Sequence, residues 1–303
     1  MKPILVLLLF VFGGRMAAQD TILPLWPKDH IPNHIASAEV EEHEHNGILR
    51  ISSVQEPSME VYLPSKSNAT GEAVLIFPGG GYGILAYDWE GTDIAKFLNG
   101  EGIAGIVVKY RLPSDTSQEN KHDVPLIDAQ RAMRLVRHNA LSFHLDANRI
   151  GILGFSAGGH LASTLGTQFN EEVYKAIDEV DAVSARPNFM ALGYPVITFG
   201  DGTHSGSKKN LLGENPSQEM VDRFSNEKNV TEQTPATFLF HASDDTAVPV
   251  ENSLLFYRAL NDNGVSATLF VYPKGGHGFS LALKDPFLRG WSDQMVQWIR
   301  NLN

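Results

Sequence analysis

The sequence has 303 residues, of which 43% are hydrophobic, and its formal net charge is −11. This size and apolar content suffice for one large α/β domain or two smaller ones, and no shift in composition divides the chain. The acidic balance argues against nucleic acid or an anionic membrane surface as a partner, because both attract basic patches. An uncharged substrate fits the charge better.

Residues 1–18 have the pattern of a secretory signal peptide. Lys2 precedes the apolar run Ile4–Phe12, and small residues follow at Ala17 and Ala18. The run is too short for a stable membrane anchor, which disfavours the alternative of an uncleaved membrane helix. The chain contains no cysteine, which excludes a disulfide framework and a lipid-acceptor cysteine. We therefore expect a periplasmic or extracellular protein with no membrane anchor after cleavage.

The first part of the mature chain predicts extended structure. Prolines in Thr21–Pro32 forbid a helix, and we expect Trp26 to pin this strap to the domain. The acidic and histidine-bearing patch Glu39–His45 has no second matching cluster, so we interpret it as a solvated face and expect no metal or other cofactor. Strands are predicted at Ile48–Val54 and Met59–Leu63, and we expect these two to pair as an antiparallel hairpin.

From residue 73 onward, buried strands alternate with helices. This alternation implies right-handed βαβ crossovers, and it predicts an α/β fold with a mostly parallel, twisted sheet and helices on both faces. The expected strands are Ala73–Phe77, Ile103–Lys109, Arg149–Phe155, Phe189–Leu192, Ala236–His241 and Thr268–Tyr272. The expected helices are Ile94–Leu98, Leu126–Ala140 with Arg131, Arg134 and Arg137 on its outer face, Val250–Leu260 and Phe287–Ile299.

We expect residues 19–303 to form one domain. The stretch Ile197–Gln233 is polar and too long for a plain connection between two elements. It predicts a small insertion that lies over the functional site.

A Gly-x-Ser-x-Gly motif lies between a buried strand and an Ala/Leu-rich helix. Such a turn presents the Ser156 hydroxyl on a strained elbow at the helix N-terminus, where it can act as a nucleophile. Gly154 and Gly158 are needed there because a side chain at either position would collide with the neighbouring strand or helix. Taken alone, the motif also fits a tight turn whose serine caps the helix.

Residues downstream supply a carboxylate and a base in the order expected for an α/β-hydrolase. Asp244 and Asp245 follow one strand, and His277 lies in a glycine-flanked loop after the next. The histidine would accept the serine proton, and a buried carboxylate would orient the imidazole. Both aspartates remain candidates on this reasoning. The other histidines considered are interpreted as packing, structural or surface residues: His122, His138, His144, His160 and His204.

A glycine run after the first buried strand predicts an anion site. The glycine amides within Pro78–Gly83, together with the Ala157 amide, can bind the oxyanion that forms when an ester is attacked, at roughly 3 kcal/mol per donor. A phosphate cradle is the competing interpretation. It is disfavoured because no Gly-Lys-Ser/Thr sequence follows the run and no dinucleotide fingerprint is completed.

Taken together, these motifs resemble the α/β-hydrolase superfamily, and within it the exported bacterial acetyl esterases that remove acetyl, and sometimes feruloyl, groups from xylan. The resemblance extends over nearly the whole mature chain. It is carried by Leu25–Pro27, Pro78–Tyr82, Lys109–Pro113, Asp128–Ala132, Gly154–Ala162 and Gly276–Phe279.

The resemblance implies site residues. A His-x-x-x-Asp-x-x-Val-Pro pattern aligns with the segment from His241 to Pro249 and selects Asp245 as the acid. Related esterases have histidine before the glycine run, where this chain has Pro78. That departure removes a side chain that supports the loop, but the implied oxyanion donors are the amides of Gly80 and Gly81.

The implied function is a secreted serine carboxylesterase that acts on an acylated carbohydrate, with Tyr82 helping to shape the pocket. A serine peptidase of the dipeptidyl peptidase type is one alternative, although those enzymes usually carry a large extra domain for which this length leaves no room. A non-catalytic carbohydrate-binding member is the other alternative. The sequence does not indicate the oligomeric state.

Overall fold

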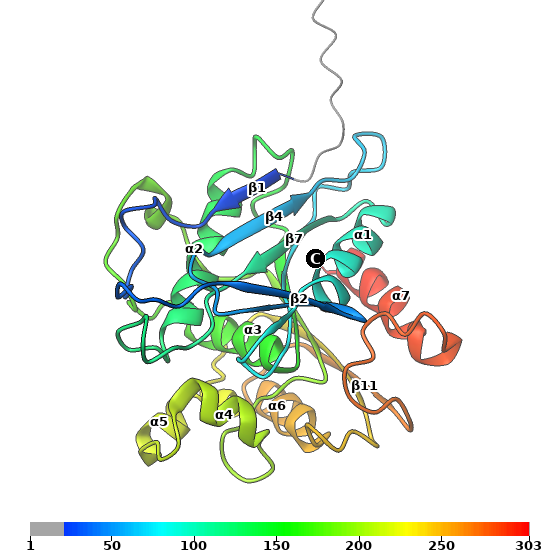
Figure 1. Ribbon diagram of the computed structural model, residues 1–303. Coiled ribbons are helices and arrows are strands. Elements are labelled where there is room, and N and C mark those ends of the chain that lie inside the picture. The colour runs from blue at the N-terminus through cyan, green and yellow to red at the C-terminus, as the bar shows by residue number, and fades with distance from the viewer. Residues whose placement is uncertain (1–20, 303) are drawn as a thin grey trace, which may run out of the picture.

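A twisted eight-stranded sheet forms the centre of the computed structural model, which describes residues 21–302 (Figure 1). Its strand order is β1-β4-β7-β5-β8-β9-β10-β11. The pairs β1–β4 and β4–β7 are antiparallel, and every pair from β7 to β11 is parallel. The strands are β1 (Thr21–Pro24), β4 (Ser58–Tyr62), β5 (Ala73–Phe77), β7 (Ala104–Lys109), β8 (Ile150–Phe155), β9 (Phe189–Gly193), β10 (Ala236–Ala242) and β11 (Ala267–Tyr272). The predicted fold class is confirmed, and the predicted signal peptide lies outside the described residues.

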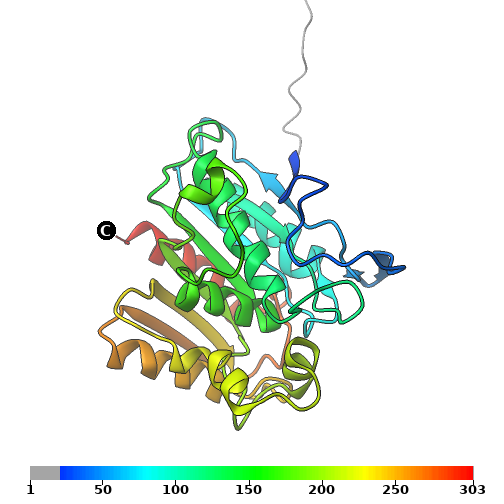
Figure 2. The ribbon, with the colours of Figure 1, turned by 90° about the vertical axis from the view of Figure 1, so that its left-hand side faces the viewer.

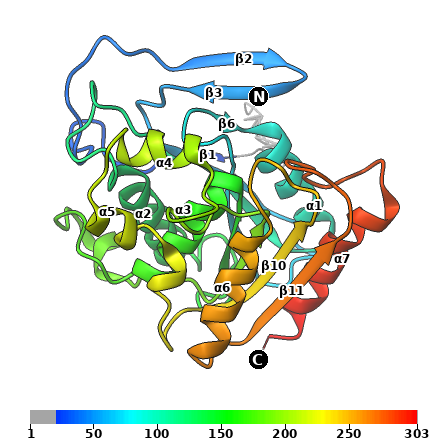
Figure 3. The same cartoon turned by 90° about the horizontal axis from the view of Figure 1, so that it is seen from below.

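Helices cover both faces of this sheet (Figure 3). On one face lie α1 (Asp93–Gly100) and α7 (Pro286–Arg300), and on the other lie α2 (Val124–His138), α3 (Ser156–Gln168) and α6 (Glu251–Asp262). In Figure 2 the green helices α2 and α3 lie side by side. Because both faces are covered, all five residues of β5 are buried, as a continuous apolar run predicts.

The predicted pairing of the two N-terminal strands is wrong. Instead, β3 (Ile48–Ser52) pairs with β2 (Glu42–Asn46) and with β6 (Leu85–Ala86) in a separate three-stranded sheet. Strand β4 lies in the main sheet, where Met59 and Val61 are buried. Alternating apolar residues identify a strand and its buried face, but they do not identify its partner. Residues 42–45 of the acidic and histidine-bearing patch lie in exposed strand β2, whereas Glu39 and Glu41 are half-buried and contact Ser114 and Lys109.

Arg131 is not on a solvated outer face of α2, as the sequence predicted. Its guanidinium donates to the Leu25 carbonyl oxygen and to the carboxylates of Asp178 and Asp181. It also lies 5.0 Å from the ring centroid of Trp26. The N-terminal strap and η2 (Glu179–Ala182) cover this part of the helix, so a charged residue is buried with its partners.

A buried ion pair connects the strap to α2. The Asp128 carboxylate accepts from the Arg111 guanidinium at 2.8 and 2.9 Å, from the Arg111 amide at 3.0 Å and from Trp26 Nε1 at 2.8 Å. Both side chains of the pair are at most 1% exposed. Trp26 therefore attaches the strap to the domain, as the sequence predicted, through its hydrogen bond to Asp128 as well as through packing.

Replacing Asp128 by alanine is expected to lower the free energy of unfolding by about 3–5 kcal/mol, because an unpaired guanidinium would remain buried. Urea or guanidinium unfolding of both proteins measures the difference. Asp115→Ala is the matched control, since this aspartate is 80% exposed in its pair with Lys121 and should cost less than about 1 kcal/mol. Equal losses in the two variants would contradict this account of the strap.

Between β9 and β10 the chain forms α4 (Ser205–Leu212), α5 (Gln218–Arg223) and η3 (Asn226–Lys228). These helices occupy the region predicted as an insertion. Within the part of the chain that the structure describes, no helix has the length and apolar character needed to cross a membrane.

Candidate active site

Five neighbouring parallel strands end at one edge of the sheet, and the residues after them converge there. In spatial order, β5, β8, β9, β10 and β11 are followed, respectively, by residues 78–83 (the glycine loop), Ser156, Tyr194, Asp245 and His277. Open α/β sheets build their sites at the carboxyl ends of strands. Residues that are up to 121 positions apart in sequence therefore form direct contacts.

The turn from β8 into α3 is the strained elbow that the motif predicted. Ser156 has φ of +52°, which is unfavourable for a residue with a side chain. A Cβ on Gly154 would lie 2.2 Å from the Gly158 carbonyl oxygen, and one on Gly158 would lie 2.1 Å from the Phe77 carbonyl oxygen. The two motif glycines are thus required by close backbone approach.

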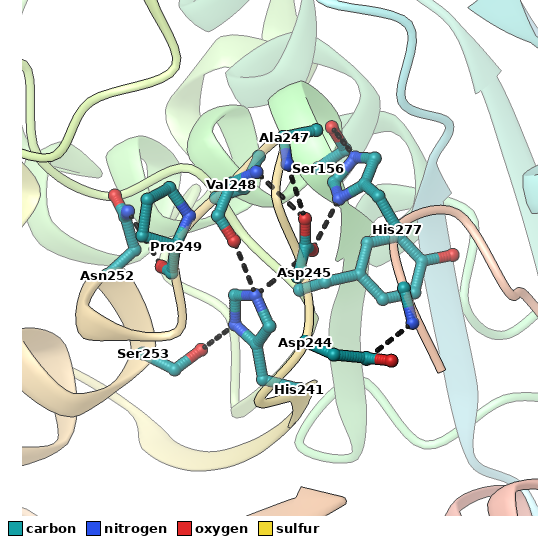
Figure 4. A network of polar contacts seen from close by, with 12 residues as sticks. Ser156, His241, Asp244, Asp245, Ala247, Val248, Pro249, Asn252, Ser253 and His277 are labelled. Carbon is teal, nitrogen blue, oxygen red and sulfur yellow. Dashed lines mark hydrogen bonds and ion pairs between the residues drawn. The ribbon is translucent and has the colours of Figure 1, made fainter. Parts of the chain in front are cut away.

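Ser156, His277 and Asp245 form a continuous chain of hydrogen bonds (Figure 4). His277 Nδ1 lies 2.6 Å from Asp245 Oδ2, and His277 Nε2 lies 2.9 Å from Ser156 Oγ. Since an ionised carboxylate can only accept, Nδ1 donates and Nε2 is left to accept the serine proton. The neighbouring Asp244 has a different contact, because its Oδ1 accepts from the Gly276 amide at 2.8 Å.

Asp245 lies in a dense set of donors. Its carboxylate accepts from the Ala247 and Val248 amides at 2.9 Å and from His241 Nε2 at 3.2 Å. Burial raises the pKa of this carboxyl, but hydrogen bonds from His241 and His277 outweigh burial and hold the pKa well below its usual range. The carboxylate is therefore ionised whenever His277 acts as a base.

The glycine loop presents its backbone to the elbow. Gly80 and Gly81 have φ of +134° and +64°, and a Cβ on Gly80 would lie 2.1 Å from the Ile84 carbonyl oxygen. Tyr110 Oη donates to the Pro78 carbonyl oxygen at 2.7 Å and supports the start of the loop. Within residues 21–302, the amides of Gly80, Gly81 and Ala157 donate to no protein acceptor. These amides therefore remain available to an anionic oxygen.

Tyr82 points into the protein, where it is 2% exposed. Its hydroxyl donates to His160 Nδ1 at 2.8 Å, because His160 Nε2 donates to the Phe224 carbonyl oxygen at 2.8 Å. The Tyr82 side chain thus anchors the glycine loop to α3. His160 is fully buried, and it is a packing residue as the sequence indicated.

His160 makes stability depend on pH. Burial lowers the pKa of its ring to about 4, whereas an unfolded histidine titrates near 6.5. Only the unfolded chain gains this proton as the pH falls from 7 to 4, so folding loses about 3 kcal/mol in that interval. Urea unfolding across this range should show a clearly smaller loss for His160→Gln. The same loss in variant and wild type would contradict the assignment.

Four residues near the site were not assigned to it from the sequence. Glu90 Oε2 accepts from the Gly79 amide at 2.9 Å, and Oε1 accepts from Tyr194 Oη at 2.7 Å. Asn210 Nδ2 donates to the Gly81 carbonyl oxygen at 2.8 Å, and the ring of His204 faces Gly81. No local pattern marks these residues, because each acts through a contact with a distant segment. His204 caps α4, and its interpretation as structural missed its place beside the glycine loop.

Comparisons with known proteins agree with this geometry. The BD-FAE family model matches residues 59–260. The endo-1,4-beta-xylanase B of Butyrivibrio fibrisolvens is 37% identical, and the match covers 78% of this chain and 36% of the relative. The acetylxylan esterase of Xylanibacter ruminicola is 34% identical, and that match covers 84% of this chain and 50% of the relative. The chain thus spans between about a third and a half of these curated relatives.

A solved structure extends the likeness to the whole fold. The acetyl ester-xyloside bifunctional hydrolase of Caldicellulosiruptor lactoaceticus superposes with a TM-score of 0.82 and 38% identity. The match covers 94% of this chain and 97% of that one. A carboxylesterase of Lactobacillus plantarum superposes with a TM-score of 0.69 at 22% identity, which shows a shared fold.

Proposed function

Because the chain belongs to the BD-FAE family and has the α/β-hydrolase fold, we propose that it is a secreted serine carboxylesterase that removes O-acetyl groups from xylan or xylo-oligosaccharides. The observation that carries the proposal is the chain of hydrogen bonds from Asp245 through His277 to Ser156, beside the unpaired amides of Gly80 and Gly81. The names of the acetylxylan esterase and the acetyl ester-xyloside hydrolase support the substrate class.

The proposed reaction begins when Ser156 Oγ attacks the acetyl carbonyl carbon. His277 Nε2 takes the hydroxyl proton, and the carbonyl oxygen becomes an oxyanion that the amides of Gly80, Gly81 and Ala157 bind. His277 then gives the proton to the departing sugar oxygen, which leaves an acetyl-serine. Water activated by the same histidine attacks this ester and releases acetate, and the proton returns to Ser156. Asp245 stabilises the imidazolium in both halves.

The glycine loop and the segment 197–233 are proposed to shape the substrate pocket. Tyr82 anchors the loop to α3 through its hydrogen bond with His160, and Asn210 of α4 donates a hydrogen bond to the Gly81 carbonyl oxygen of the loop. Tyr82 is proposed to influence substrate binding through the position of this backbone, because its own side chain is buried.

A substrate panel tests this proposal. We expect efficient release of acetate from acetylated xylo-oligosaccharides and from an aryl acetate, with rates that fall for longer acyl chains. A serine peptidase would instead cleave peptide amides, such as an X-Pro-aryl amide, faster than these esters. A non-catalytic carbohydrate-binding protein would hydrolyse neither, and a fluorophosphonate probe would not label Ser156.

We also propose that residues 1–18 direct export and are removed. Expression in a bacterial host, followed by mass measurement of the periplasmic protein, tests this step. The full-length mass recovered only from the cytoplasm would contradict it.

A further inference from the structure

Glu90 lies beneath the site and connects two of its loops. It belongs to η1 (Asp88–Thr92) and is 4% exposed. One carboxylate oxygen holds the Gly79 amide, next to the proposed oxyanion donors, and the other holds the hydroxyl of Tyr194. A Cβ on Gly79 would lie 2.6 Å from Glu90 Oε2 and 2.9 Å from Ser156 Cβ. The carboxylate therefore lies immediately behind both the glycine loop and the elbow.

Tyr194 connects Glu90 to residues 273–280 after β11, which contain His277 and are called the histidine loop. Its hydroxyl oxygen accepts from the Ser280 amide at 3.0 Å, so its proton is directed to Glu90. Its ring packs edge-on against the ring of His277, with 5.0 Å between the centroids. Trp89 adds a second link, because its Nε1 donates to the Gly278 carbonyl oxygen at 2.8 Å. The η1 segment thus holds the glycine loop and the histidine loop in one arrangement.

The contacts of Glu90 fit the ionised form. Both oxygens accept from groups that can only donate in this arrangement, so a proton on the carboxyl would displace one of these bonds. Burial raises the pKa of Glu90 above its ordinary range, and the hydrogen bonds from Tyr194 and Gly79 and the charge of His277 offset this rise only in part. A buried anion near the imidazole favours its protonated state, which each half of an acyl-transfer reaction forms.

We propose that Glu90 is a positioning carboxylate that fixes the glycine loop and the histidine loop in their catalytic arrangement and stabilises the His277 imidazolium. This inference rests on the proposed function. It adds a second buried carboxylate to the site, in addition to Asp245 of the proposed triad.

The titratable groups around this carboxylate and His277 come from several elements. A pH effect of Glu90 therefore acts in addition to their contributions, which Glu90→Gln leaves in place. These groups are Asp245, His204, Tyr110 and Tyr194.

The test uses Glu90→Gln, which keeps the side-chain shape but removes the charge and one acceptor. We expect kcat for an aryl acetate to fall roughly tenfold to a hundredfold, with KM changed less than about twofold because the ground-state ester gains little from the oxyanion site. The acid limb of the kcat/KM profile should move to lower pH by about one unit, since the imidazolium loses a nearby anion.

Glu72→Gln is the matched control. Glu72 is also 4% exposed, but it lies at the amino end of β5, away from the site at the carboxyl ends of the strands, and it pairs with Arg149. We expect this control to keep the wild-type kcat and acid limb. A merely structural role for Glu90 would lower the melting temperature without moving the acid limb of the folded enzyme, and that result would overturn the proposal.

Two further variants keep the test decisive. Tyr194→Phe removes the hydroxyl that connects Glu90 to the Ser280 amide. It replaces Glu90→Gln as the test variant if Glu90→Gln does not fold. It should lower kcat at unchanged KM, and unchanged kcat would overturn the proposal. Ser156→Ala distinguishes a failure of the proposed function from a failure of the Glu90 proposal. An active Ser156→Ala would refute the proposed function. An inactive Ser156→Ala together with a fully active Glu90→Gln would refute only the role of Glu90.

Discussion

Ser156→Ala is expected to lower kcat for an aryl acetate by about 10⁶-fold, leaving only the residual effect of binding and the anion site. The proposed covalent step cannot occur without Oγ, and within residues 21–302 His277 Nε2 forms a hydrogen bond with no other hydroxyl. Steady-state kinetics and active-site titration with a fluorophosphonate measure the loss.

Ser292→Ala is a suitable control for that variant. This serine is also buried, but it lies in α7 and its hydroxyl donates only to the Arg289 carbonyl oxygen. It should retain wild-type turnover. If Ser156→Ala kept turnover within tenfold of the control, Ser156 would not be the nucleophile.

Asp245→Asn is expected to lower kcat by about 10⁴-fold, because an amide at this position favours the wrong histidine tautomer and cannot stabilise the imidazolium. Asp244→Asn is the matched control one residue away. Its carboxylate holds the Gly276 amide, so we expect a loss of about tenfold or less from a looser histidine loop. If Asp244→Asn lost more activity than Asp245→Asn with the same aryl acetate, the triad acid would be Asp244 and the proposed assignment would be wrong.

The central strands and the elbow could be predicted because their signals are local. The buried run Ala73–Phe77 is apolar at every position and became β5 with the expected bounds. The motif around Ser156 needs its glycines for backbone clearance, a requirement that any chain with this turn must meet. Since parallel strands bring their carboxyl ends to one edge, the chain order of serine, acid and histidine also predicted that these residues would meet.

The remaining features depend on contacts between distant segments. The residue pattern of β4 shows which face is buried, but not that β1 and β7 are its neighbours. The spacing of Arg131 in the sequence is that of an exposed helix residue, but in the structure the strap and η2 cover it. Glu90 stands in no recognisable motif, and only the fold shows that its two oxygens connect the glycine loop to Tyr194.

The central claim is that Ser156 removes acetyl groups from a carbohydrate, and acetate release from acetylated xylan tests it most directly. We predict that the wild-type protein releases acetate at neutral to mildly alkaline pH, where His277 can act as a base. Ser156→Ala should release none above the buffer control. Equal release by the two proteins, or hydrolysis of aryl acetates without any acetate from the xylan, would contradict the account.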